Sequence, residues 1–113
     1  MKQTQLLKGV LEGCVLLIIS EEEIYGYDMV QKLRNFGFTE MTGGTIYPLL
    51  QKLEKNKLIS SITRPSPDGP DRKYFQLTKD GQSYTQEFIK QWRNLSSNVE
   101  EIIHSKERFL HDK

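Results

Sequence analysis

The last third of the chain carries an apolar repeat that is too long for a small domain to cover alone. Apolar side chains step by four and three residues along it, at Phe88, Trp92, Leu95, Val99, Ile102 and Phe109. This spacing predicts a helix with coiled-coil character. A helix of about 30 residues is roughly 45 Å long, so we expect part of this apolar seam to lie against a partner.

Composition narrows the class of protein to a small folded domain. A chain of 113 residues is enough for one domain. Hydrophobic residues make up 36% of the chain and charged residues 27%. This composition is too apolar for a disordered tail and too polar for a membrane protein. The start, at residues 1–5, lacks the pattern of a secretory leader. The single Cys14 suits a reducing compartment, so we expect a soluble cytoplasmic protein.

The charge is distributed unevenly along the chain. Residues 51–79 carry seven Lys or Arg against three Asp or Glu, whereas residues 1–50 carry four against six and residues 80–113 five against six. A local basic segment favours an anionic partner, nucleic acid above all. The alternative is an ordinary solvated charged surface.

Periodicity and turn residues predict the order of elements. Three helices are expected first, over residues 5–20, 26–35 and about 44–56. The third has an apolar stripe at Ile46, Leu49, Leu50 and Leu53, with Pro48 in its first turn and Thr45 as a capping residue. Two strands, Leu58–Thr63 and Lys73–Leu77, flank a Pro-rich and Gly-rich loop, and Thr78 caps the long final helix.

This order is that of a winged helix-turn-helix: mainly α, with a small β-hairpin and a long C-terminal dimerisation helix. In that fold the third helix enters the major groove and the hairpin, or wing, reaches adjacent DNA. The side of the third helix opposite its apolar stripe presents Gly44, Pro48, Gln51, Lys52 and Lys55. Gln can pair with an adenine edge, and Lys can reach phosphate or guanine. Gly43 and Gly44 expose N–H groups at the helix start, which attracts phosphate.

Other candidate DNA contacts lie on the wing and on tyrosines. The wing ends in Arg64, Arg72 and Lys73. Each of these charges could instead be merely solvated. Tyr47 beside the helix start could contact phosphate through its hydroxyl or pack on the wing. The same two alternatives apply to Tyr25 and Tyr27.

Three segments resemble the PadR-type transcriptional regulators. They are Tyr25-Gly26-Tyr27-Asp28, the stretch from Gly44-Thr45-Ile46-Tyr47-Pro48 to Glu54, and Arg72-Lys73-Tyr74-Phe75 to Gly81. The resemblance spans nearly the whole chain and implies DNA contacts from these segments, Thr45 included. It implies a winged helix-turn-helix over residues 1–77 and a dimerisation helix over residues 78–113. It also implies a homodimeric repressor on a palindromic operator, with an interface at Leu7, Leu11, Phe88, Trp92, Leu95, Val99 and Ile102.

The resemblance further implies that a small planar aromatic or multidrug-like ligand can bind at the Trp92 position and release the DNA. The alternative is that Trp92 is an interface aromatic without a ligand. Residues His104 and His111, with Glu100, leave a shared metal site conceivable, but no Cys/His cluster supports one. We expect no cofactor, no metal and no enzymatic activity, since no phosphate loop or activated nucleophile is present. The competing function is a winged helix that binds only proteins.

Overall fold

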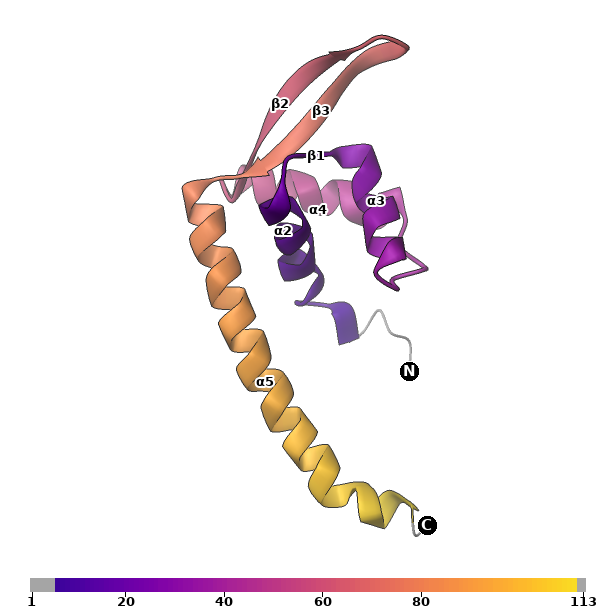
Figure 1. The fold of residues 1–113 in the computed structure, drawn as a ribbon, viewed down its shortest axis with the longest axis vertical. Coiled ribbons are helices and arrows are strands. Elements are labelled where there is room, and N and C mark those ends of the chain that lie inside the picture. Colours follow the sequence, from indigo (N-terminus) through magenta and orange to yellow (C-terminus); the bar gives the residue numbers. More distant parts are fainter. Residues whose placement is uncertain (1–5, 112–113) are drawn as a thin grey trace.

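The computed structural model describes residues 6–111, and its helices and strands alternate in the order of a winged helix-turn-helix (Figure 1). The elements are α2 (Leu11–Glu21), β1 (Ile24–Tyr25), α3 (Gly26–Asn35), α4 (Gly43–Lys55), β2 (Ile59–Ser66), β3 (Gly69–Leu77) and α5 (Lys79–His111). Helices α2, α3 and α4 and the three strands form a head, and α5 projects from it (Figure 1). The predicted fold class is confirmed. Within residues 6–111, no helix combines the length and apolarity needed to cross a bilayer.

The first predicted helix is shorter than the apolar spacing suggested. Gln5, its predicted start, lies outside the described residues, and Lys8–Val10 form a turn before α2 begins at Leu11. The break falls at Gly9, whose φ of +93° is a backbone conformation that side-chain-bearing residues rarely adopt. The prediction of one continuous helix over residues 5–20 is therefore wrong at its N-terminal end.

The core lies where α2, α3 and α4 meet one side of the sheet. Ile46, Leu50 and Leu53 of α4 are buried, and Leu49 packs at the edge of the same cluster. From α2 come Val15, Leu16 and Ile19, and from α3 Met29 and Leu33. The α4 stripe predicted from i, i+3, i+4 and i+7 spacing is thus the inner face of this helix.

Both ends of α4 differ in detail from the prediction. The helix begins at Gly43 after Thr42, whose carbonyl oxygen accepts from the amides of Thr45 and Ile46, so Thr45 is not the capping residue. Pro48 is consequently inside the helix rather than in its first turn. At the C-terminal end, Lys57 and not Asn56 has the left-handed conformation, with φ of 63°.

The sheet has three strands, one more than the hairpin that the sequence predicted. Its order is β1-β3-β2, all antiparallel, with Ile24 opposite Phe75 and Tyr25 opposite Tyr74. Strands β2 and β3 extend far into the segment predicted as a loop, pairing as far as Ser66 and Gly69 with an irregularity after Arg64. Strand β1 has only two residues, too short to produce a periodic signal in the sequence.

Helix α5 is anchored at its N-terminal end. The Thr78 hydroxyl accepts from the Gly81 amide at 3.0 Å, which confirms the predicted cap. Gly81 is required there, because a Cβ at this position would lie 1.9 Å from the carbonyl oxygen of Leu58. The radius of gyration is 17.2 Å, against roughly 13 Å for a compact chain of this length, because the C-terminal part of α5 extends away from the head (Figure 1).

Candidate nucleic-acid interface

The surface of α4 divides into three sides around its buried stripe. Gly44, Pro48, Gln51 and Lys55 are exposed on the side opposite the stripe. Among the described residues, no carboxylate forms an ion pair with Lys55. This outward side is free to meet a partner.

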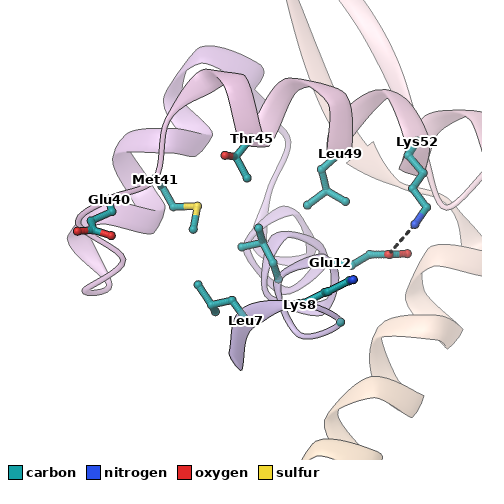
Figure 2. A pocket seen from close by; sticks show the side chains of 10 residues that line it. Leu7, Lys8, Glu12, Glu40, Met41, Thr45, Leu49 and Lys52 are labelled. Atoms are coloured by element: carbon teal, nitrogen blue, oxygen red, sulfur yellow. Dashed lines mark ion pairs between the residues drawn. The ribbon is translucent and has the colours of Figure 1, made fainter. Parts of the chain in front are cut away.

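The predicted contacts Thr45 and Lys52 lie on a different side of α4, which faces α2. Figure 2 shows Thr45, Leu49 and Lys52 pointing from α4 toward α2, and the Lys52 ammonium lies 3.6 Å from the Glu12 carboxylate. A hollow of about 360 Å³ separates these elements and is also lined by Leu7 and Leu11. Leu7 and Leu11, predicted as dimer-interface residues, are therefore partly buried against the edge of the core of their own chain.

The opposite flank of α4 meets the start of α3 and the wing. A hollow of about 340 Å³ there is lined by Tyr25, Tyr27, Tyr47, Gln51 and Lys73, five residues that the sequence predicted as DNA contacts. The Tyr47 ring lies against Gly43, where a Cβ would come within 2.7 Å of it, so the glycine makes room for the ring. The structure thus brings together residues from three separate sequence segments.

The basic residues of the wing lie on both faces of its hairpin. Arg64 and Arg72 are directly opposite one another on β2 and β3, so their side chains share one face. Each lies beside a tyrosine ring of that face, with Arg72 4.9 Å from the centre of Tyr25 and Arg64 5.7 Å from that of Tyr74. Lys73 occupies the other face, beside the Phe75 ring and toward α4.

Glu54 of α4 joins the helix to both strands of the wing. Its carboxylate accepts a hydrogen bond from Lys73 of β3 at 2.8 Å and another from the Ser61 hydroxyl of β2. These hydrogen bonds, that of Lys73 first, lower the pKa of the Glu54 carboxyl below its ordinary value. Sequence analysis gave Glu54 no role, because no spacing rule relates it to either partner.

A second carboxylate, to which the sequence analysis gave no role, forms an ion pair with Arg64. Glu23, just before β1, places its two carboxylate oxygens 2.8 and 3.0 Å from the same guanidinium nitrogen of Arg64. This hydrogen-bonded pair raises the pKa of Arg64. Lys52, Arg64 and Lys73 thus each have an acidic partner, whereas the sequence presented them as an unbalanced basic segment.

The apolar seam of α5 is largely exposed beyond its contact with α2. Trp92, Leu95, Val99 and Ile102 are 45%, 57%, 46% and 63% exposed. Phe88 differs from them, because its ring packs over Gly13 of α2, where a Cβ would come within 2.4 Å. Phe88 is therefore already partly buried within its own chain.

Trp92, the predicted ligand contact, lies beside a hollow of about 420 Å³ between α5 and the turn that precedes α2. Its other lining residues include Phe88, Leu95 and the amides Gln91, Asn94 and Asn98. Among residues 6–111 no group of three His, Cys, Asp or Glu side chains could hold a metal ion, so His104 and His111 form no such site within one chain.

Comparisons with known proteins relate this architecture to a family. The model of the PadR-like family of transcriptional regulators matches residues 15–87, more than half of the chain. An uncharacterized protein of Lysinibacillus sphaericus is 31% identical over 105 residues, which are 91% of this chain and 93% of that protein.

Solved structures agree in both fold and sequence. The crystal structure of a Streptococcus transcriptional regulator is 61% identical, with a TM-score of 0.79 over 87% of this chain and 96% of that one. A PadR-like transcriptional regulator from Bacillus cereus is 46% identical, with a TM-score of 0.80 over 88% of this chain and 96% of that one. The chain whose α4, wing and tyrosines meet in this way belongs to the PadR-like family of transcriptional regulators, which are DNA-binding proteins and not enzymes.

Proposed function

We propose that this protein is a homodimeric repressor that binds a palindromic operator through α4, the start of α3 and the wing. The observation that carries the DNA-binding surface is the hollow shared by Tyr25, Tyr27, Tyr47, Gln51 and Lys73 beside the exposed outward side of α4. Gln51 and Lys55 supply the groups that read bases and hold phosphates. The α4 N–H groups at Gly43 and Gly44 add a site that attracts phosphate.

The dimer is supported by the apolar seam of α5. Exposed apolar patches of this kind mark interaction sites on soluble proteins, and a helical seam with coiled-coil spacing suits a second copy of itself. Trp92, Leu95, Val99 and Ile102 form its centre, and Phe88 contributes from its edge beside α2. Leu7 and Leu11 complete the proposed interface from the segment that also lines the hollow between α2 and α4. A two-fold pair then presents two α4 helices to successive major grooves on one face of DNA.

The effector is proposed from Trp92 and its hollow. Two long helices that cross near the two-fold axis bring Trp92 close to its copy, and flat rings then wall a gap suited to a planar aromatic or cationic compound. Since the crossing angle of the two α5 helices sets the spacing of the two α4 helices, a ligand that favours one angle shifts the dimer away from its DNA-bound state. DNA must then weaken ligand binding by the same factor.

The DNA-binding proposal is tested by footprinting the protein on its own upstream region, with gel shifts on the protected duplex at several salt concentrations. We expect a protected palindrome and an affinity that falls steeply with salt. A protein that binds no duplex even at low salt would support the alternative of a module that binds only proteins.

The effector proposal is tested through fluorescence, because Trp92 is the single tryptophan. Planar dyes titrated into the wild-type protein should quench its emission and release labelled operator DNA. Trp92→Ala should bind the same dyes more weakly, measured by the dye's own fluorescence anisotropy. Equal dye binding by both proteins would contradict a ligand site at Trp92.

A further inference from the structure

Arg64, a basic residue of the wing, forms an ion pair with Glu23. Glu23 lies 41 residues from Arg64 in the sequence, outside the basic segment of residues 51–79, yet both of its carboxylate oxygens are within 3.0 Å of one guanidinium nitrogen. The pair is at the surface, with the Arg64 side chain 50% and the Glu23 side chain 34% exposed. A phosphate that approaches Arg64 therefore meets a carboxylate that already occupies part of its hydrogen-bonding edge.

The position of Arg64 explains why an acidic partner stabilises the protein when no DNA is bound. Arg64 lies directly opposite Arg72 on the same face of the hairpin, and like charges opposite one another destabilise a strand pair. Glu23 offsets this repulsion when no DNA is present. On DNA, phosphates would supply the same negative charge, so the carboxylate and a phosphate are alternative partners for Arg64.

We propose that Glu23 is an internal counter-ion that competes with DNA phosphate for Arg64 and thereby sets the sequence-independent part of the DNA affinity. The inference rests on the proposed function, in which the wing contacts DNA. Phosphate contacts carry no base information, so removing the carboxylate raises the affinity for operator and unrelated duplexes alike. An exposed ion pair of this kind corresponds to roughly a two- to fivefold change in an equilibrium constant.

The experiment compares Glu23→Gln with Glu22→Gln. Glu22 is the exposed neighbouring residue, so both variants remove one negative charge from the same connection, but only the first removes the partner of Arg64. Binding to an unrelated duplex and to the operator is measured over a range of salt concentrations, and thermal unfolding verifies that each variant is folded. We expect Glu23→Gln to bind both duplexes about two- to fivefold more tightly than Glu22→Gln, with a salt slope steeper by up to about one.

Arg64→Ala, alone and combined with Glu23→Gln, separates the inference from the function beneath it. The gain from Glu23→Gln should disappear when Arg64 is absent, because the two side chains act as a pair. If Arg64→Ala binds DNA as well as the wild type, the proposed wing contact fails and the inference fails with it. If Arg64→Ala weakens binding but Glu23→Gln equals Glu22→Gln, or binds more weakly, the DNA-binding proposal stands. The counter-ion role of Glu23 is then overturned.

Discussion

The head and the C-terminal part of α5 differ in how far their apolar side chains are buried. In the head, residues such as Leu16, Ile46 and Leu53 are fully buried among α2, α3, α4 and the sheet. Along α5, the seam from Trp92 to Ile102 has the same apolar character but is about half exposed. One chain therefore completes its own winged-helix core and leaves the α5 seam uncovered. The proposed dimer would cover that seam.

Among the variants that test this difference, Val99→Asp should have the largest effect. An unpaired charge placed in a dry interface costs about 3–5 kcal/mol, so we expect loss of the dimer and of operator binding while the head remains folded. Analytical ultracentrifugation measures the first, and a gel shift the second. Ser97→Asp, on the other side of α5, is the matched control and should remain dimeric. A wild-type protein that sediments as a monomer at micromolar concentration would contradict the proposed dimer.

Leu16→Ala tests the completeness of the head. Leu16 is 0% exposed, and truncation of a buried leucine costs about 2–5 kcal/mol of unfolding free energy. Urea denaturation measures the loss. The control is Leu110→Ala near the end of α5, where the side chain is 71% exposed and the expected change is within about 0.5 kcal/mol. Similar losses for both variants would mean that the C-terminal end of α5 is covered as fully as the core.

Gly81→Ala tests the junction between the head and α5. The added Cβ would overlap the Leu58 carbonyl oxygen, a backbone atom that cannot rotate away. We expect a loss of about 1–3 kcal/mol, typical of overpacking, measured by thermal unfolding. Gln82→Ala changes the next, exposed residue of the same helix and should leave stability nearly unchanged. If Gly81→Ala were as stable as the wild type, the close approach of α5 to Leu58 would be wrong.

Lys55→Ala and Lys52→Ala compare two lysines within the head. We expect Lys55→Ala to weaken operator binding and to lower the salt slope by about one, as the loss of a phosphate contact does. Lys52→Ala should have a smaller effect, because Lys52 faces α2 and pairs with Glu12. Arg72→Ala, on the wing, should resemble Lys55→Ala. Unchanged binding in all three variants would refute the docking face.

The smallest effect of this series is expected from the pH dependence of stability that arises where Glu54 of α4 contacts the wing. The folded pKa of Glu54 is lowered by Lys73 and Ser61, so its stabilising contribution is present above the ordinary pKa of a glutamate and is lost as pH falls through the lowered value. Glu54→Gln should therefore lose less stability than the wild type between about pH 5 and pH 3. A Glu54→Gln variant that loses as much stability as the wild type over this range would contradict the role of Glu54 in this contact.

The sequence by itself determined the elements whose signals are local. The stripe from Ile46 to Leu53, the bounds of α3, the Thr78 cap and the length of α5 follow from spacing within one element. These features depend on neighbours three or four residues apart, which lie together in any helix.

The tertiary structure alone decided what joins distant segments. The pairing of β1 with β3, the contacts of Glu23 with Arg64 and of Glu54 with Lys73, and the Phe88 ring over Gly13 bring together residues 19 to 75 positions apart. The same holds for the sides of α4, since periodicity identifies the buried stripe but not which element each flank faces. Such contacts depend on the path of the whole chain, and a local repeat carries no information about that path.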